Sequence, residues 1–597
     1  MKKLSETINL ALNLFNKDQK EKAINIIDLL IKNNEENTDL LIIHAKMNNG
    51  VNNIDKANNS LLKVLEYQPS NIQALKLIYV NYLRDSKYDL AIKYIDILLN
   101  LKTNDYELFR DKAFIEYLNK NYKISKSFID EALKLNKEEV FGLNVAGLLH
   151  VENGDTIKAI NYFKKAISIN KNYIDSFNNL GKCYIDLEEL DKAYFYFKKA
   201  FRLNSKSYLP LMNIANILSL KDKNKLAIKF YKKILELEPN NQVVEENIAI
   251  CNCRLKNFDW VEKKYKDQLK VGNLNHNLVL GYSYLLLNKK RFSEAFNLFD
   301  ARLKTDSLKK KNIHHSNIIE KLIFNGKLEK DEKLLIVKEG GVGDEILFSS
   351  MYKNLIENDF SGVKIECDIR LLEIFKRSFN KNVFFPFGHF SSSKTKSNEF
   401  HKVIYSGSLT KYFRQNEKDF KVKPYLKTLK SLDDKFSLEL NNFSKKKKIG
   451  LSWRSVINIF GGLKSLKISD FEKLFSYNRL FVNLQYGDTS DEIAKFEKYG
   501  KEIYNFKKID LFNDFDSLIS ILKSLDIFVT VSNSTAHFAG ALGVKTILVC
   551  PKKSSTYYYW DYEDGRTPWY PSISIVKFTN SVDYTMNLIN DLIEESS

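Results

Sequence analysis

The sequence predicts an all-α array of helical hairpins followed by an α/β region with parallel strands. The first observation is a period of 34 residues that runs through the first half of the 597-residue chain. The second is a change in composition, because residues 1–330 contain eight glycines and the shorter remainder contains fourteen. The third is a series of short β-rich runs that alternate with helix-length segments in the remainder. The two halves are therefore expected to differ in architecture.

The 34-residue period continues without insertion over nine units. Seven of the nine positions reached by stepping 34 residues from Ala23 are alanine, and the residue four positions further on is always apolar or aromatic. Within one unit, Phe177, Leu180 and Tyr184 mark the face of one helix, and Phe197 lies on the face of the next. We interpret these periodic residues as core rather than as chemistry.

This pattern resembles the tetratricopeptide repeat over about residues 5–306. One such hairpin cannot bury its apolar face alone, so the repeats are expected to stack into a superhelix with a long concave surface. The resemblance implies a protein or peptide partner on that surface, contacted by polar side chains that the sequence does not single out.

Nine β-rich runs mark the second half of the chain. Helix-length segments separate them, which predicts parallel βαβ units with right-handed crossovers. They form two clusters, at about residues 333–430 and 447–580, and the sites of such sheets lie at the carboxyl ends of the strands. The runs cover residues 333–338, 363–367, 383–385, 402–405, 449–453, 480–485, 526–531, 546–550 and 573–578.

The segment EGGVGDEILFSS follows the first of these runs and opens a helix-like pattern. It matches neither the phosphate-loop pattern nor the dinucleotide fingerprint. Its glycines, Gly341 and Gly343 among them, would still let a ligand approach the backbone at a helix start. The alternative is a tight turn capped by Asp344.

The segment TVSNSTAHFAGALGVKTILVCP predicts a strand, a hydroxyl-rich turn, a helix and a second strand. Amides and hydroxyls of residues 532–535 at a helix N-terminus would make an anion site, to which the helix dipole adds attraction. His537 would sit in the first turn and donate to a phosphate or a sugar hydroxyl. The residues of this expected site are Ser532, Asn533, Ser534, Thr535 and His537.

Together with RTPWYPS downstream, these two segments resemble the C-terminal region of bacterial tetratricopeptide proteins whose catalytic-like domain is similar to family 9 heptosyltransferases and to O-linked N-acetylglucosamine transferases. The resemblance covers about residues 333–580. It implies the two-lobed GT-B fold, with a nucleotide-sugar between two Rossmann-like lobes. The expected domains are repeats at 1–306, a junction at 307–332, a first lobe at 333–440, and a second lobe with the donor-binding motif and a terminal helix at 441–597.

The resemblance also implies roles for individual residues. Asp344 matches the aspartate proposed as general base toward the acceptor hydroxyl. Lys464 matches a basic position that neutralises the donor diphosphate, and Arg454 is a second candidate for that charge. Gly341 and Gly343 would lie beside the donor, and the helix start at Ser534, Thr535 and His537 would hold its phosphates.

Two features depart from the pattern of these transferases. Many relatives carry an aspartate where this chain has Ser532, so any role of that carboxylate is missing. Residues 552–565 match only roughly the tryptophan-rich stretch of the relatives. Trp560, Trp569 and Tyr570 are candidates for lining the nucleobase or sugar pocket, and the alternative is that they are core.

No metal and no cofactor is expected. The pattern Asp514-Phe515-Asp516 is of the Asp-x-Asp type that binds manganese in the other large glycosyltransferase fold. Because it begins a helix-like segment, we favour a capping role. Enzymes with the GT-B fold stabilise the leaving diphosphate with helix dipoles and basic side chains instead of a cation.

The net charge of +19 would suit a polyanionic partner, but lysine is spread along the whole chain, so nucleic-acid binding is disfavoured. No apolar stretch approaches the length that spans a membrane, and the N-terminus lacks the apolar run of a secretory signal. Five scattered cysteines fit a reducing compartment, so a cytoplasmic location is expected.

Two hypotheses for function remain open. The first is a metal-independent glycosyltransferase that moves a sugar from a nucleotide-sugar to a hydroxyl on a protein or glycan, with the acceptor selected by the repeats. The alternative is a non-catalytic scaffold for protein–protein interaction, with a degenerate glycosyltransferase-like domain.

Overall fold

Two compact units, Met1–Pro210 and Leu211–Ser597, divide the chain in the computed structural model. The structure describes residues 2–101, 104–205, 207–305, 326–327, 332–357, 362–391, 399–420, 423–443, 446–455, 465–475, 478–497, 502–550, 556–562, 564–578 and 581–595. Most of the expected junction at 307–332 therefore lies outside the described residues.

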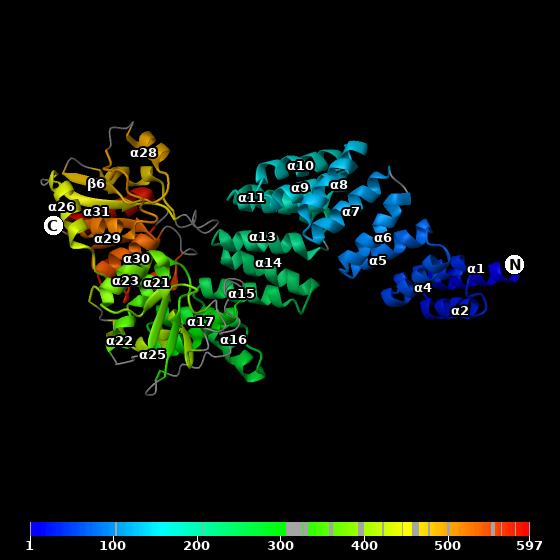
Figure 1. The fold of residues 1–597 in the computed structure, drawn as a ribbon, viewed down its shortest axis with the longest axis horizontal. Helices are drawn as coiled ribbons and strands as arrows, with labels where there is room; N and C mark the ends of the chain where they lie inside the picture. Colours follow the sequence, from blue (N-terminus) through cyan, green and yellow to red (C-terminus); the bar gives the residue numbers. More distant parts are fainter. Residues whose placement is uncertain are drawn as a thin grey trace. The chain divides into compact units, whose positions relative to one another are not determined.

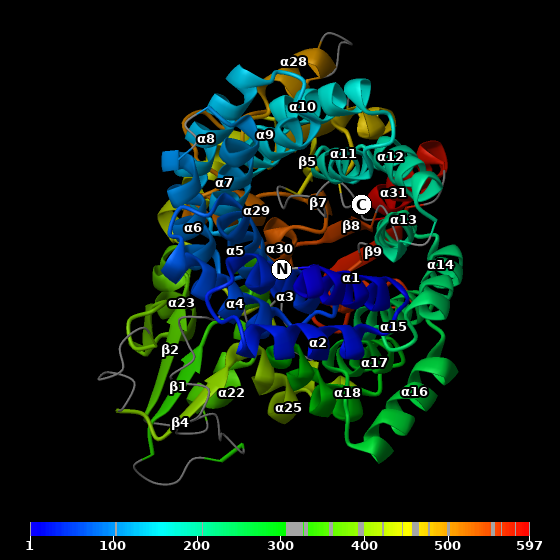
Figure 2. The ribbon, with the colours of Figure 1, turned by 90° about the vertical axis from the view of Figure 1, so that its right-hand side faces the viewer.

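The first unit consists, where described, of helices that pack in consecutive pairs (Figures 1 and 2). Each pair covers one of the predicted 34-residue repeats, and the helices are 13 to 15 residues long. Their bounds are α1 (Lys2–Asn16), α2 (Lys20–Lys32), α3 (Thr38–Gly50), α4 (Ile54–Tyr67), α5 (Ile72–Arg84), α6 (Tyr88–Leu101), α7 (Tyr106–Leu118), α8 (Tyr122–Leu135), α9 (Val140–Glu152), α10 (Thr156–Ile169), α11 (Ile174–Asp186) and α12 (Leu190–Leu203).

The same repeat continues into the second unit. Three further helix pairs and a final 3₁₀ helix lead from residue 208 to residue 304. They are α13 (Tyr208–Leu220), α14 (Asn224–Leu237), α15 (Gln242–Arg254), α16 (Phe258–Val271), α17 (His276–Asn288), α18 (Phe292–Leu298) and η1 (Phe299–Lys304).

The periodic small residues are core, as the sequence predicts. All nine positions of the alanine series have no exposed surface, including Ser125 and Val261 where alanine is replaced. At Gly181 an added Cβ would come within 2.5 Å of the Phe197 ring, so the two helices of that pair approach as closely as a glycine allows.

The turns inside the hairpins share a left-handed residue that the sequence does not reveal. One residue between the two helices of each pair has φ between +54° and +77°, and the nine positions are 34 residues apart. Only one of them is glycine. They are Asp18, Asn52, Ser86, Lys120, Gly154, Glu188, Asp222, Lys256 and Lys290.

In the second half of the chain, each of the nine β-rich runs overlaps a strand, with bounds that differ by up to two residues. The first four strands form a parallel sheet in the order β3-β2-β1-β4, with Ile336 of β1 aligned with Ile365 and Ile404. We call the part at residues 332–420 lobe 1. Its elements are β1 (Leu334–Val337), α21 (Val342–Ser349), α22 (Tyr352–Glu357), β2 (Val363–Cys367), η3 (Ile369–Leu371), α23 (Leu372–Phe379), β3 (Phe384–Pro386), β4 (Lys402–Tyr405), η4 (Ser406–Leu409), α25 (Thr410–Phe413) and η5 (Glu417–Phe420).

The other five strands form a second parallel sheet in the order β6-β5-β7-β8-β9. We call residues 446–578 lobe 2. Helix α26 (Lys430–Asn441) connects the lobes, and α31 (Val582–Glu594) follows lobe 2. The elements of lobe 2 are β5 (Lys447–Ser452), η6 (Ile468–Leu474), β6 (Arg479–Asn483), α28 (Ser490–Glu497), α29 (Phe515–Lys523), β7 (Ile527–Val531), α30 (Ser534–Leu542), β8 (Thr546–Cys550), η8 (Tyr558–Trp560) and β9 (Ile573–Lys577).

The last repeat and both lobes share one hydrophobic core. Phe296 of α18 lies edge-on to Trp569 of lobe 2 and beside Phe420 of lobe 1, and Phe420 and Trp569 are themselves 5.0 Å apart between ring centroids. Burial of such aromatic rings is among the largest stabilising contributions available to a core. Within the second unit, the end of the repeat array is therefore built into the α/β region.

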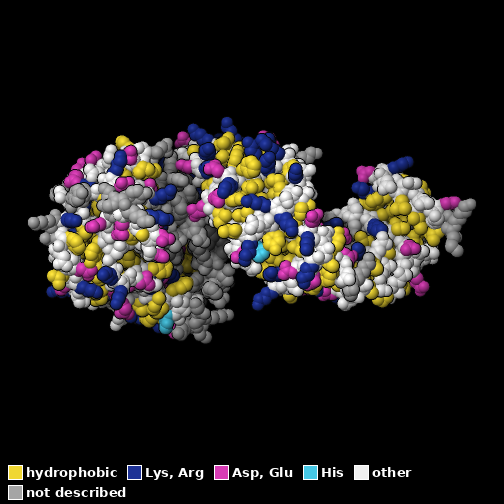
Figure 3. Space-filling model, turned by 90° about the horizontal axis from the view of Figure 1, so that it is seen from above, with side chains coloured by type: hydrophobic (Ala, Val, Ile, Leu, Met, Phe, Trp, Pro, Cys, Tyr) yellow, Lys and Arg dark blue, Asp and Glu magenta, His cyan; other side chains and the backbone are white. Residues whose placement is uncertain are grey.

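Charged side chains are unevenly distributed over the visible surface. In Figure 3, Lys and Arg side chains are dense along one edge of the repeats, whereas the two signs alternate over the α/β part. The second helices of two repeats carry the exposed pairs Lys164-Lys165 and Lys198-Lys199. In the part of the chain that the structure describes, no helix combines the length and apolar character needed to cross a membrane.

The left-handed turn position predicts opposite effects of two substitutions. Gly154 has φ +77° and nothing within 4 Å of an added Cβ, so Gly154→Ala introduces backbone strain without a clash. It should cost about 1 kcal/mol. At the matching position Lys120, with φ +65°, Lys120→Gly should be neutral or slightly stabilising. Urea unfolding of the full chain, followed by far-UV circular dichroism, measures both; a more stable Gly154→Ala variant would contradict the assignment.

Candidate functional site

Each sheet reverses its strand order at one place, and such places are where ligands bind in open α/β sheets. The reversal lies between β1 and β4 in lobe 1 and between β5 and β7 in lobe 2. The segments that leave these strands contain most of the residues singled out in the sequence. They are residues 339–344, 453–455 and 532–535.

The start of α21 is a glycine turn held by Asp344. Gly340 has φ +72°, and the Gly341 amide donates a hydrogen bond of 3.0 Å to Asp344 Oδ2. The capping role that the sequence offered as an alternative is therefore confirmed. It leaves the ligand hypothesis open, because nothing lies within 4 Å of a Cβ added at Gly341.

The start of α30 is capped by Asn533. Its side chain accepts from the Ala536 amide at 3.1 Å and donates to Ser452 Oγ at the end of β5, at 2.9 Å. Thr535 Oγ1 is buried without a hydrogen-bond partner among the described residues. Ser532 and Thr535 are both buried, and Ser534 is partly exposed. The hydroxyl-rich turn thus lies at the carboxyl end of β7, as predicted.

The two helix starts meet at Gly343 and His537. A Cβ added at Gly343 would come within 2.8 Å of His537 Cδ2, so only glycine fits without a shift of the imidazole. His537 is 3% exposed, and its Nδ1 lies 3.1 Å from Tyr570 Oη. Burial lowers the pKa of His537 to about 3, so the imidazole is neutral. A neutral imidazole brings no positive charge to a phosphate.

Asp344 lines a pocket of about 280 Å³, which we call the Asp344 pocket. Three parts of the second unit build it: the last repeat, the β1–α21 turn with α21, and residues 556–559, which lead into η8. The rings of Tyr284 and Tyr558 stack at 5.0 Å across the boundary between repeat and lobe 2. Its lining includes Leu280, Tyr284, Arg302, Glu339, Asp344, Tyr557, Tyr558 and Tyr559.

A buried ion pair joins the repeat array to this pocket. Arg302 of η1 donates to Glu339 at 2.7 Å and to Ser408 Oγ at 2.9 Å, so it reaches the ends of both β1 and β4. The two charged side chains are only 6% and 4% exposed. Removing one partner of such a pair costs about 3–5 kcal/mol, because the other charge remains buried.

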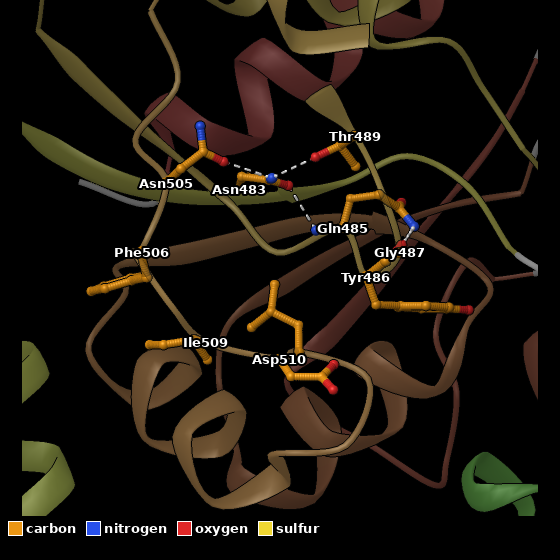
Figure 4. A pocket seen from close by; sticks show the side chains of 10 residues that line it. Asn483, Gln485, Tyr486, Gly487, Thr489, Asn505, Phe506, Ile509 and Asp510 are labelled. Atoms are coloured by element: carbon orange, nitrogen blue, oxygen red, sulfur yellow. Dashed lines mark hydrogen bonds between the residues drawn. The ribbon is translucent and has the colours of Figure 1, made fainter. Parts of the chain in front are cut away.

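A second pocket, of about 240 Å³, lies at the end of β6, and we call it the β6 pocket (Figure 4). The Asn483 side chain donates to Asn505 Oδ1 at 2.7 Å and to Thr489 Oγ1 at 3.2 Å, and its Oδ1 accepts from the Gln485 backbone amide at 2.8 Å. Tyr486 and Asp510 complete the wall. Amides, a ring and a carboxylate around one cavity suit a flat polar ring such as a nucleobase.

Hydrogen bonds connect the β6 pocket to the start of α30. Gln485 Oε1 accepts from Ser452 Oγ at 3.1 Å and from the Arg454 amide at 2.8 Å. Ser452 in turn accepts from Asn533, the cap of α30. The carboxyl ends of β5, β6 and β7 are therefore held in one hydrogen-bonded group.

The two candidate cations differ in what the structure shows. Arg454 donates to Glu492 at 3.0 Å and to the Asp488 carbonyl at 2.6 Å, beside Gly487 of the β6 pocket. Its guanidinium is thus already partnered at the rim of that pocket. Lys464 lies outside the described residues, so its role stays a prediction.

The three candidate aromatics are buried in the core. Trp560, Trp569 and Tyr570 are at most 3% exposed, and none of them lines the Asp344 pocket or the β6 pocket. Trp560 and Tyr570 instead surround the His537 ring. The core interpretation is therefore the better description. The adjacent residues 557–559 line the Asp344 pocket instead. The run of three tyrosines in the sequence is the signal that could have indicated them.

The Asp-x-Asp pattern is a helix cap, as favoured from the sequence. Asp514 Oδ1 accepts from the Ser517 amide at 3.0 Å at the start of α29, and Asp516 pairs with Arg377 of lobe 1. Sequence reasoning missed Tyr284 and Arg302, because in a repeat they look like any other core or surface position.

A tetratricopeptide repeat family model matches residues 142–173, 174–207 and 210–241, which are the pairs α9–α10, α11–α12 and α13–α14. These units are therefore tetratricopeptide repeats, and such repeats are protein-interaction modules. Protein FlbA of Caulobacter vibrioides is 27% identical over 269 residues, which is 42% of this chain and 44% of FlbA. The chain thus spans less than half the length of this curated relative.

Solved tetratricopeptide proteins are similar at lower identity. A repeat protein from Parabacteroides merdae is 16% identical, covers 42% of this chain and 98% of its own, and has a TM-score of 0.38. PilF of Pseudomonas aeruginosa is 18% identical, covers 36% of this chain and 96% of its own, and has a TM-score of 0.30. Both TM-scores are below 0.5, so no functional argument rests on these similarities.

The neutral His537 predicts a pH dependence of stability. Its folded-state pKa of about 3 lies below the ordinary value of 6.5, so the unfolded state binds more protons between these values. Stability should therefore fall as pH drops below 6.5, by about 1.4 kcal/mol per pH unit from this group. The melting-temperature difference between wild type and His537→Asn should narrow from pH 7 to pH 5. Parallel pH profiles of the two proteins would contradict this.

Proposed function

We propose that the protein is a glycosyltransferase that moves a sugar from a nucleotide-sugar to a hydroxyl on an acceptor held by the repeats. The observation that carries the proposal is the meeting of two helix starts, one from each lobe, beside a pocket that contains Asp344 and is completed by the last repeat. The resemblance of the two glycine-containing segments to heptosyltransferases and O-linked N-acetylglucosamine transferases supports the same activity and the GT-B fold.

The donor would occupy lobe 2. Its base would enter the β6 pocket, where Tyr486 offers a ring face and Asn483, Asn505 and Asp510 offer polar groups. Its diphosphate would lie at the start of α30, where the amides of the first turn and the helix dipole favour negative charge. Ser534 and Thr535 are placed there, and Arg454 and Lys464 are the expected cations. The proposal requires no metal.

The acceptor hydroxyl would reach Asp344 in its pocket. As general base, the Asp344 carboxylate would take the hydroxyl proton while the oxygen attacks the anomeric carbon and the nucleoside diphosphate leaves. The Gly341 amide donates to Asp344 Oδ2, and this hydrogen bond orients the carboxylate. Tyr284 and Arg302 belong to the last repeat. An acceptor bound along the repeats would therefore enter a pocket whose wall the repeats help to form.

The alternative proposal is a scaffold whose α/β region has lost activity. One structural observation favours it: His537 is buried and uncharged. The resemblance to the transferases adds a second argument, because it implies a carboxylate where this chain has Ser532. The tetratricopeptide repeats would then serve protein binding alone.

Nucleotide binding separates these two proposals. UDP, GDP or ADP at 100 times its Kd should stabilise the folded protein by about 2.7 kcal/mol, visible as a rise in melting temperature. Tyr486→Ala should weaken binding about tenfold or more, because base–ring stacking is lost. Tyr584→Ala, on an exposed tyrosine of α31, is the matched control. No shift with any of the three diphosphates would favour the scaffold.

Asp344→Asn tests the chemistry. Loss of a general base should lower transfer by about 10²–10⁴-fold, whereas the asparagine oxygen can still cap α21 and nucleotide binding should survive. Glu373→Gln, which removes an exposed carboxylate elsewhere in lobe 1, should leave transfer unchanged. Transfer is measured by mass spectrometry of cell-extract proteins and glycans, with sugar nucleotides that match the bound diphosphate. Full activity of Asp344→Asn would remove Asp344 from the mechanism.

A further inference from the structure

The helix that carries Asp344 is tied to the ends of two strands through its neighbour Glu345. The Glu345 side chain is 1% exposed, and one oxygen accepts from Lys338 Nζ at 2.7 Å. The other oxygen accepts from the Asp368 amide at 2.8 Å, directly after β2. The position of the first turn of α21 therefore depends on where the segment after β2 lies.

That segment holds an arginine in a fixed geometry. Arg370 Nε and Nη2 donate to the two oxygens of Asp368, each at 2.9 Å, and the Arg370 amide also donates to Asp368 at 3.0 Å. Two parallel bonds between guanidinium and carboxylate restrict orientation as well as distance. The third nitrogen, Nη1, is directed elsewhere.

Arg370 uses this remaining nitrogen to contact lobe 2. Nη1 donates to the Phe512 carbonyl at 3.0 Å, and the guanidinium lies over the rings of Phe512 and Phe515, at 5.3 and 4.8 Å from their centroids. Phe512 follows Asp510 and Leu511, which line the β6 pocket, and its ring is 6.0 Å from that of Tyr486 in the same wall. Lobe 1 therefore touches the wall of the β6 pocket through one side chain.

We propose that Arg370 is a positioning residue that links occupation of the β6 pocket to the placement of Asp344. The link rests on the proposed function, because it treats the β6 pocket as the donor site. A base stacked in that pocket restrains Tyr486 and residues 510–512. Arg370 passes that restraint to Asp368, and Asp368 passes it to Glu345 and the first turn of α21. The Asp344 carboxylate then adopts its working position as general base when the donor is bound.

The chain offers a matched control for this contact. Arg377 of α23 also crosses from lobe 1 to lobe 2, where it pairs with Asp516 of α29. Its side chain is 22% exposed, against 23% for Arg370. Arg377 bonds to the Lys427 carbonyl and lines neither pocket. Arg377→Ala therefore removes an arginine contact between the lobes without interrupting the path from the β6 pocket to α21.

Hydrogen exchange of the full chain, with and without UDP, GDP or ADP, tests the link. In wild type, the bound diphosphate should slow amide exchange both in residues 509–515 and in α21. In Arg370→Ala, protection should remain in 509–515 and disappear from α21; in Arg377→Ala, both should remain. Arg370→Ala should also lower kcat about tenfold and raise KM by a smaller factor. Arg370→Lys should recover only part of the lost kcat.

The outcomes distinguish the inference from the proposed function. Protection of α21 that persists in Arg370→Ala, or that never occurs in wild type although 509–515 is protected, overturns the role of Arg370 and leaves the donor site intact. Absence of protection in 509–515 with all three diphosphates overturns the proposed donor site, and the link with it. Equal loss of α21 protection in Arg377→Ala shows a general weakening of the lobe contact and also overturns the specific role of Arg370.

Discussion

The contact between Gly343 and His537 is the constraint on which the arrangement of the site depends. Helices α21 and α30 begin in different lobes, and their first turns pack together only because one contributes no side chain and the other an uncharged ring. A larger residue at 343 would push the imidazole away, and a protonated imidazole would carry an unpaired charge into a buried cluster of Tyr559, Trp560 and Tyr570. With this contact in place, the first turns of α21 and α30, which carry Asp344 and the hydroxyl-rich residues, lie side by side.

The last repeat forms part of the wall of the Asp344 pocket. Arg302 and Glu339 are both almost fully buried, and burying two charges is unfavourable unless each finds its partners. Here the partners come from a repeat and from the segments that follow β1 and β4, so the ion pair is satisfied only when the last repeat docks on lobe 1. The aromatic contacts of Phe296, Phe420 and Trp569 extend the same docking to lobe 2.

Much of the fold could be predicted because its signals are local and periodic. The alanine series predicts the helix pairs, and all nine of its positions are buried. The β-rich runs predict the nine strands found among the described residues. The left-handed residue of the hairpin turns could not be predicted, because aspartate, asparagine, serine, lysine, glutamate and glycine all occupy that position. In the site, the sequence did not predict Asn533 as a cap, but capping by Asp344, as one of two alternatives, followed from its place after a strand. The burial of Trp569 and Tyr570 did not, because an aromatic residue serves equally well as core or as pocket wall.

By itself, the sequence determined the periodic helix pairs, the parallel strands and the two helix starts that bear polar residues, because each depends on neighbours within one turn or one strand. Only the tertiary structure decided which of those residues meet. Three contacts join residues that lie 37 to 194 positions apart in the sequence: Gly343 with His537, Arg302 with Glu339, and Arg370 with Phe512. Such contacts arise from how sheets, helices and repeats pack, and side-chain burial and charge then follow from the packing.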